Sequence, residues 1–346
     1  MTGSPLLRFL AAVRRLAPGL GLAAAIAAAA TVIGSLVPLV GAAVPGLLIG
    51  AAIGAVRRPG ARVRPGIDFA AKRVLQTSVV LLGTQLSVLD VARVGVAGLP
   101  VTVGTLAVGL AAAWALGRAL RVGGDTTVLI GVGTGVCGAS AIAATAPVIG
   151  AAAADVAYSV STIFAFNIAA VLIFPLVGHL LGMSQAGFGL FAGTAVNDTS
   201  SVVAAAAAYG PVATDHAIVV KLVRTLAIIP ITLVLAAVTR RRDRSPGVPR
   251  PAARGLWDVV RLVPWFLVGF VLMAVLNSLG LVPAAAHPPL SAAAGYLIAV
   301  ALSAIGLSVD LAAMRRAGWR PLLLGGSLWV VVSVTSLGLQ AVTGST

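Results

Sequence analysis

Uncharged apolar runs of about 20 residues, the length that a helix needs to cross a bilayer core, recur along the whole chain. Hydrophobic residues make up 59% of the 346 residues and charged residues only 10%, with a mean hydropathy of +1.07. A soluble domain carries roughly 25% charged residues. The runs are continuously apolar rather than alternating, which favours helices over a barrel. The sequence therefore predicts an all-α, polytopic membrane protein, with residues 1–346 in a single domain.

The runs also predict how many segments the protein contains, roughly nine to eleven. The first run follows basic residues as a signal core does, but it is longer and another run follows almost at once, so we expect an uncleaved first helix. The runs lie near residues 17–37, 39–56, 69–88, 96–117, 126–149, 154–181, 186–209, 213–239, 261–280, 290–309 and 320–342.

Positive charge is concentrated in some connections between the runs and nearly absent from others. Lys and Arg number 24 against 9 acidic residues, a net charge of +15. Basic residues precede the first run, cluster between the second and third, and fill the loop 240–260. This is the positive-inside bias of helical membrane proteins. It predicts a membrane protein with a cytoplasmic N-terminus, whose charge meets the lipid bilayer rather than nucleic acid.

Residues suited to metal or redox chemistry are few. Cys137 is the only cysteine, so it cannot form an internal disulfide or a cysteine-based metal site. The chain has three histidines, and its acidic residues are all Asp. The segment "GVGTGVCGAS" lacks the Lys of a phosphate-binding P-loop. We therefore expect no metal, no cofactor and no ATP-driven step.

Two internal repeats are visible in the sequence. Residues 133–157 match residues 193–217 at a constant offset of 60 positions (193 − 133), with paired Gly, Thr, Ser and Asp. A weaker repeat pairs 85–95 with 306–318, where each apolar helix ends in Leu-Ser-Val before an Asp and Arg. Repeats of opposite orientation are common in secondary transporters.

The number of membrane crossings between the two copies of a repeat decides whether they are parallel or inverted, and this constrains the topology. If every run crosses the membrane, the weaker repeat is inverted and the stronger one is parallel, which is inconsistent. If 126–149 and 186–209 instead re-enter, both repeats are inverted. We therefore predict two opposed re-entrant or broken segments and nine crossings, with eleven crossings as the alternative.

The two predicted re-entrant segments, 126–149 and 186–209, also contain the candidate binding residues apart from Asn167. Irregular backbone at membrane depth occurs where it is buried in protein or lines a cavity. A helix that restarts there presents free N–H groups and a positive dipole end, which suit an anion. The alternative for the second segment is a plain helix cap at a membrane surface. The predicted substrate-binding residues are Thr134, Gly135, Gly138, Ser140, Asn167, Asn197, Thr199 and Ser200.

Three ionisable residues form the predicted ion-coupling set. Asp198 lies in the polar run "NDTSS", and an ionisable group inside a membrane segment is a functional candidate. Lys221 and Arg224 are three residues apart on one helix face, so they could neutralise Asp198 or attract an anion. Snorkelling toward the surface is the alternative for both cations. For Asn167, helix–helix contact and substrate contact both remain open.

The same motifs resemble a known family. "LLGTQLSVLD", "GVGTGVCGASAIAATAPVI", "AGTAVNDTSSVVAAAAAYG" and "ATDHAIVVKLVRTLAIIPI" look like the YeiH-type sulfate exporter family of bacterial inner-membrane proteins. The resemblance covers roughly residues 20–340. It implies the cation/proton antiporter and anion transporter fold group, with inverted repeats crossing at a central site, and export of sulfate or a related sulfur oxyanion.

Together these features predict a secondary transporter of a small inorganic or organic anion, coupled to H⁺ or Na⁺, for which a homodimer is one compatible assembly. A cation/proton antiporter using Asp198 is the main alternative. An intramembrane enzyme is the distant one, and it would need Ser140 or Ser200 as nucleophile with His216 as base. We expect no enzymatic activity.

Overall fold

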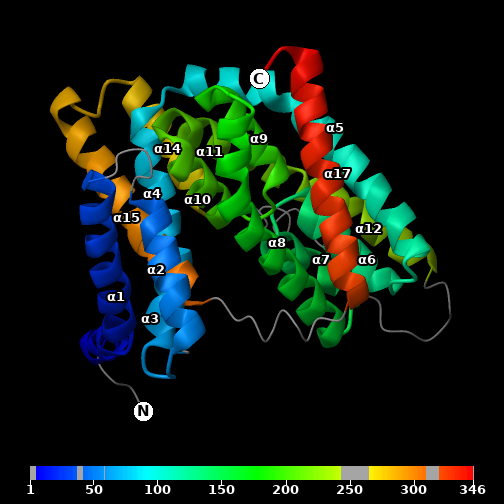
Figure 1. The fold of residues 1–346 in the computed structure, drawn as a ribbon, viewed down its shortest axis with the longest axis horizontal. Coiled ribbons are helices and arrows are strands. Elements are labelled where there is room, and N and C mark those ends of the chain that lie inside the picture. The colour runs from blue at the N-terminus through cyan, green and yellow to red at the C-terminus, as the bar shows by residue number, and fades with distance from the viewer. Residues whose placement is uncertain (1–4, 37–41, 58, 243–264, 309–318, 346) are drawn as a thin grey trace. The chain divides into compact units, whose positions relative to one another are not determined.

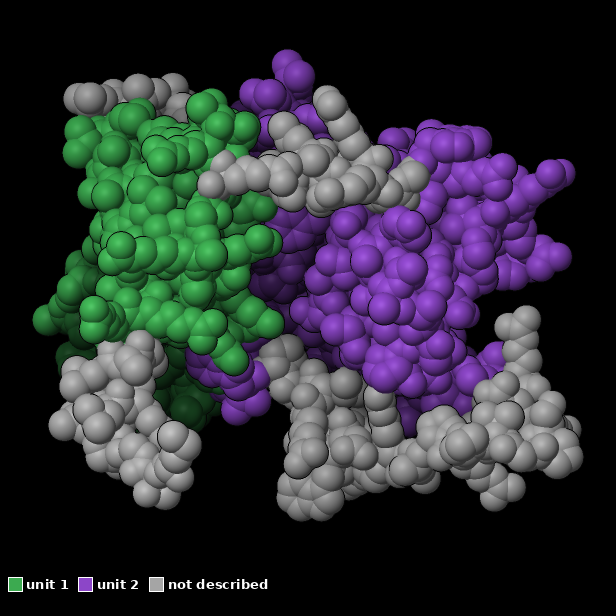
Figure 2. All heavy atoms as spheres, turned by 90° about the horizontal axis from the view of Figure 1, so that it is seen from below, with its two compact units in different colours: residues 1–88, 207–209, 269–311 green, residues 89–206, 210–268, 312–346 purple. Residues whose placement is uncertain are grey.

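A computed structural model describes residues 5–36, 42–57, 59–242, 265–308 and 319–345, and within these ranges it contains helices and turns but no β-strand (Figure 1). The all-α prediction is thus confirmed. Contacts divide the expected single domain into two compact units that share the chain in an interleaved order (Figure 2). Unit 1 is residues 1–88, 207–209 and 269–311, and unit 2 is residues 89–206, 210–268 and 312–346.

Six helices among the described residues are long and apolar enough to cross a membrane. These are Val13–Gly34, Val88–Ala119, Ala153–Leu180, Pro211–Thr239, Ala284–Leu307 and Trp319–Thr343. Further apolar helices of 10–17 residues accompany them, two of which follow the breaks in the predicted re-entrant segments. The chain is a multi-pass helical membrane protein.

Unit 1 is held together by close helix contacts. A Cβ atom at Gly50 would lie 2.3 Å from the Ser303 carbonyl oxygen, and one at Gly306 would lie 2.3 Å from the Leu47 oxygen. Small residues at these points let two backbones touch, as membrane helices often do. The elements are α1 (Pro5–Leu36), α2 (Ala43–Val56), α3 (Arg64–Phe69), the π-helix η1 (Ala70–Val74), α4 (Leu75–Leu82), η2 (Gly83–Gln85), α14 (Trp265–Ser278), η3 (Ala284–Ala286) and α15 (His287–Leu307).

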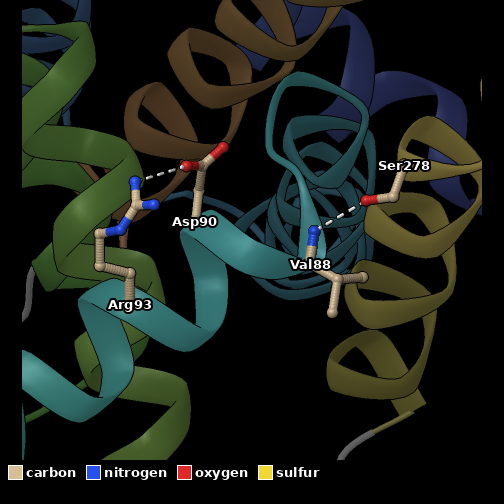
Figure 3. A network of polar contacts seen from close by, with 4 residues as sticks. All are labelled: Val88, Asp90, Arg93 and Ser278. Atoms are coloured by element: carbon tan, nitrogen blue, oxygen red, sulfur yellow. Dashed lines mark hydrogen bonds and ion pairs between the residues drawn. The ribbon is translucent and has the colours of Figure 1, made fainter.

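The weaker repeat is inverted within this unit. Gln85 Nε2, at the end of η2, donates to the His287 carbonyl oxygen at the start of α15 (3.3 Å), so α4 and α15 run antiparallel. The end of η2 at Gln85 and the end of α15 at Leu307 therefore lie at opposite ends of the pair. The Val88 N–H donates to Ser278 Oγ (2.8 Å), which places the end of α14 beside Val88, shortly after η2 ends (Figure 3). Residues 309–318 of this repeat, and the loop 240–260 from 243 onward, lie outside the described residues.

Unit 2 repeats one pattern at the expected offset of 60. Two helix–break–helix segments, hairpin 1 (124–149) and hairpin 2 (185–209), are each followed by a long helical stretch. Figure 3 also shows an exposed Asp90–Arg93 ion pair (3.5 Å) in the first turns of α5, which contributes little to stability. The elements are α5 (Val88–Ala119), α6 (Gly124–Gly135), α7 (Ala139–Ile149), α8 (Ala153–Leu180), α9 (Gln185–Ala195), α10 (Thr199–Tyr209), α11 (Pro211–Leu226), α12 (Ile228–Arg242) and α17 (Trp319–Thr343).

Hairpin 1 begins and finishes near the same end of α8, the end where α8 starts. Thr126 Oγ1 donates to Asp155 Oδ1, so α6 and α8 begin side by side. Further along, a Cβ at Gly133 would lie 3.1 Å from Ile163, which shows that α6 and α8 run parallel. Because α8 starts where α6 starts, α7 must carry the chain back. Hairpin 1 is therefore re-entrant.

Hairpin 2 has the same geometry. Gln185 Oε1 accepts the Val212 N–H (3.0 Å), so α9 and α11 begin together. A Cβ at Gly189 would lie 2.7 Å from the Ala213 oxygen, and one at Gly193 would lie 2.7 Å from Val220. The two helices thus run parallel in close contact, so α10, which joins them in the sequence, must carry the chain back.

The two hairpins enter from opposite ends of α8. Hairpin 1 begins beside the first turns of this 28-residue helix, and hairpin 2 begins just after its last turn. Ile163 and Asn167, near its middle, contact hairpins 1 and 2 respectively close to their breaks. The two predicted broken segments in opposed orientation are confirmed, and the number of membrane crossings stays a prediction. The predicted run 213–239 is divided at Ala227 into α11 and α12.

Candidate functional site

The tips of the two hairpins touch at matched positions, forming a crossover. A Cβ atom at Gly138 would lie 3.1 Å from Asp198 Cβ, and the two residues are 60 positions apart. Gly138 has φ +68° and ψ −132°, a conformation that L side chains rarely adopt. A side chain at this position would both strain the backbone and press on Asp198. Glycine is required here for both reasons.

Lys221 reaches both hairpins from α11. Its side chain is fully buried, and Nζ donates to the carbonyl oxygens of Val136 (2.8 Å) and Val196 (2.9 Å). These carbonyls follow the last turns of α6 and α9, where acceptors have no partner within the helix and the dipole end is negative. One ammonium therefore caps two helices.

Arg224 does the same one turn further along α11, and it is also fully buried. Its Nη2 donates to the Thr134 oxygen (2.9 Å), Nε donates to the Gly135 oxygen, and Nη1 donates to the Thr194 oxygen. The planar guanidinium thus holds carbonyls from both hairpins in one fork. The glycines of α9 make this reach short, because they let α11 pack directly on the backbone of α9.

The start of α10 is held by acceptors. Asn167, buried in α8, accepts the N–H groups of Asn197 and Asp198 at its Oδ1 atom (both 3.2 Å). Asp198 caps the helix, because its Oδ2 accepts the Ser200 N–H (3.0 Å) and the Ser200 hydroxyl. Asn167 therefore makes a contact between helices, which is one of the two roles predicted for it.

Asp198 is not paired directly with Lys221 or Arg224. Among the described residues, no ion pair within 4.0 Å joins Asp198 to either cation, and the hydrogen bonds of both cations go to carbonyls. The physical reason is that the C-ends of α6 and α9 lie next to α11 and offer carbonyl acceptors that have no partner within their own helices. Snorkelling is excluded for both, since their side chains are fully buried.

The predicted substrate residues separate into two groups. Thr134 and Gly135 lie at the capped end of α6, so their carbonyls already accept bonds from Arg224. Ser140 is exposed in the first turn of α7, and Thr199 and Ser200 are half-buried in the first turn of α10. No acceptor among the described residues takes the N–H of Ala139 or Ser140. The open end of the crossover is thus the start of α7.

Some polar supports were not singled out from the sequence. Thr194 Oγ1 lies 2.7 Å from Ser336 Oγ, which also accepts from Gln340 Nε2 (3.1 Å), so α17 braces hairpin 2. Ser336 and Gln340 are four positions apart in an apolar run, and this spacing on one helix face was the available signal. Asn197 Oδ1 and the Thr134 hydroxyl are buried and have no partner among the described residues.

The residues of the alternative enzyme are not brought together by the hydrogen bonds described. His216 Nδ1 lies 3.0 Å from the Val212 carbonyl oxygen, at the base of hairpin 2, whereas Ser200 Oγ bonds Asp198 at its tip. Within the described residues, no group of three or more His, Cys, Asp or Glu could hold a metal ion.

Comparison with known proteins identifies the family. The family model described as "Conserved hypothetical protein 698" matches residues 18–325. A "UPF0324 membrane protein" of Streptococcus agalactiae serotype V is 39% identical over 336 residues, covering 95% of this chain and 98% of the relative. A relative of the same description from Streptococcus pyogenes serotype M3 is 40% identical over 331 residues, covering 94% and 97%.

A third such relative, from Fusobacterium nucleatum, is 38% identical over 332 residues and covers 90% of this chain and 94% of its own length. No solved structure matches the chain. The expected YeiH-type resemblance is consistent with these matches. The chain, a multi-pass helical membrane protein with two opposed re-entrant hairpins, belongs to the family described as conserved hypothetical protein 698, together with the UPF0324 membrane proteins.

Proposed function

We propose that this protein is a secondary transporter of a small anion, such as sulfate or a related sulfur oxyanion, driven by an ion gradient. The observation that carries the proposal is the charge balance at the crossover. Lys221 and Arg224 contribute two buried positive charges and Asp198 one negative charge, a formal sum of +1 (2 − 1). An uncompensated positive charge in a membrane is costly. A bound anion would offset it.

The start of α7 supplies the contacts for that anion. The N–H groups of Ala139 and Ser140 and the positive end of the helix dipole favour negative charge. The exposed Ser140 hydroxyl adds a donor. Gly138 has no side chain to keep an oxyanion away from the backbone. Thr199 adds a hydroxyl group from the facing start of α10, whereas the Ser200 hydroxyl already donates to Asp198.

Asp198 provides a means of coupling. It belongs to the same crossover, in contact range of Gly138, so its negative charge opposes a bound anion. Protonation would remove that charge and strengthen anion binding, which links the two equilibria. Import and export both follow from this linkage, and the gradients decide the direction.

The proposed location is the cytoplasmic membrane, with the N-terminus in the cytoplasm. The basic clusters support it through the positive-inside bias. Reporter fusions at the two termini would test it. A homodimer is a separate proposal that crosslinking in native membranes would test.

The function is tested by flux of radiolabelled sulfate, sulfite and thiosulfate in proteoliposomes under imposed pH and Na⁺ gradients. We expect gradient-dependent anion flux that is lost in Asp198→Asn and kept in Asp90→Asn, a matched change at an exposed ion pair. Flux retained in Asp198→Asn would refute its coupling role. No flux with any of these anions, together with proton-linked Na⁺ flux, would favour the cation/proton antiporter instead.

A further inference from the structure

The C-ends of α6 and α9 are where a free cation would be expected at this crossover. Helix C-ends carry unpaired carbonyls and a negative dipole end. In transporters with broken helices, such carbonyls coordinate sodium ions. In this chain, the carbonyls of Thr134, Gly135 and Val136 in hairpin 1, and of Thr194 and Val196 in hairpin 2, accept hydrogen bonds from α11.

Both donors are fixed in place. Lys221 and Arg224 have no exposed side-chain surface, and the glycines of α9 hold α11 against hairpin 2. The Lys221 ammonium uses two of its three N–H donors, one on a carbonyl of each hairpin. The guanidinium uses all three of its nitrogens on carbonyls. A metal ion would have to displace these charged donors, and it would then face their positive charges at close range.

We propose that Lys221 and Arg224 are resident cations that occupy the sodium position of the crossover. These carbonyls therefore hold no free sodium ion, and transport does not depend on a sodium gradient. The statement about transport rests on the proposed function. The statement about ion binding rests on the hydrogen bonds alone. Removing either side chain creates a vacancy that a small organic cation of the same chemistry can fill.

The test measures thermal unfolding of the full-length protein in NaCl, KCl and choline chloride at equal ionic strength. Wild type should have the same Tm in all three salts. Arg224→Ala and Lys221→Ala should each lower Tm by about 5–10 °C. Methylguanidinium should restore Arg224→Ala, and methylammonium should restore Lys221→Ala, with the swapped pairs less effective. Arg93→Ala, at an exposed site, should show no loss and no response.

A selective rise of the wild-type Tm in NaCl would overturn the proposal, as would Ala variants that keep the wild-type Tm or respond to neither cation. If an Ala variant does not fold, stoichiometric binding of radiolabelled sodium to wild type decides against the proposal, and its absence supports it. Sodium independence without anion flux would remove the proposed function and keep the resident cations. Anion flux that requires a sodium gradient would keep the proposed function and remove the proposal of resident cations.

Discussion

Hairpins 1 and 2 have the same geometry but break their helices by different means. Hairpin 1 turns through Gly138, which can adopt its positive φ because glycine has no side chain. Hairpin 2 turns through Asp198 in an ordinary extended conformation (φ −97°, ψ 145°), and its side chain caps the next helix. Backbone freedom and side-chain hydrogen bonding are thus two solutions to one geometric problem. Only the second places a carboxylate at the crossover.

The helices that follow the hairpins, α8 and α11, also differ in the polar groups that they offer to the hairpins. Asn167 of α8 offers an acceptor to the start of α10, whereas α11 offers the donors Lys221 and Arg224 to the ends of α6 and α9. At the matched positions, 60 residues away, stand Ala227, Ser161 and Phe164. The repeat therefore preserves the path of the backbone while the charges have become asymmetric, which leaves the start of α7 as the open end.

The largest difference concerns the side from which each hairpin enters. Ala152→Cys and Ala186→Cys, both at exposed positions at the base of a hairpin, should be labelled by a membrane-impermeant maleimide from opposite sides of the membrane. With a cytoplasmic N-terminus, Ala152→Cys should be cytoplasmic and Ala186→Cys periplasmic. The wild-type chain, with its buried Cys137, is the control and should not react. Labelling of both sites from one side would contradict opposed entry.

The next largest effect should appear at the glycine tip. Gly138→Ala combines a positive φ with a Cβ 3.1 Å from Asp198, and should lower the free energy of unfolding by about 2–4 kcal/mol. Gly150→Ala also has a positive φ (+69°), but with ψ 29° it lies in the left-handed helical region and has nothing within 4 Å, so it should cost only about 1–2 kcal/mol. Chemical denaturation in detergent measures both. Equal losses would mean that neither the ψ of −132° at Gly138 nor the contact between the tips adds to the loss of stability.

A smaller effect should come from the acceptor on α8. Asn167→Leu leaves the N–H groups of Asn197 and Asp198 unpaired, and should cost roughly 1–3 kcal/mol of unfolding free energy. Asn167→Asp keeps a carboxylate oxygen in the acceptor position and serves as the matched variant. A Leu variant as stable as wild type would show that hairpin 2 does not need this support.

The smallest effect should separate the matched threonines. Thr194→Val removes a hydroxyl bonded to Ser336 and should cost about 0.5–1.5 kcal/mol. Thr134→Val removes a buried hydroxyl that has no partner among the described residues, so it should be neutral or stabilising. The same denaturation assay compares them. A larger loss for Thr134→Val would point to a bound water or ligand at that hydroxyl.

Much of this architecture follows from the sequence alone. Apolar run length determines the helical membrane class, and the offset of 60 together with the count of crossings predicts that residues 126–149 and 186–209 turn back on themselves. Glycines near 133–138 and the polar run 197–201 mark both breaks, because each residue type has a clear local effect on the backbone.

Only the tertiary structure decided what Lys221 and Arg224 bind. A buried cation needs an acceptor, but a carboxylate at Asp198 and the carbonyls of two helix ends meet that need equally well in a sequence. The chosen carbonyls of hairpin 1 are 85 to 90 positions from the cations and have no side-chain signature. Any residue has a carbonyl, so its availability depends on where helices end and meet in space. For the same reason, the contact of Gly138 with Asp198 emerged only from the folded chain.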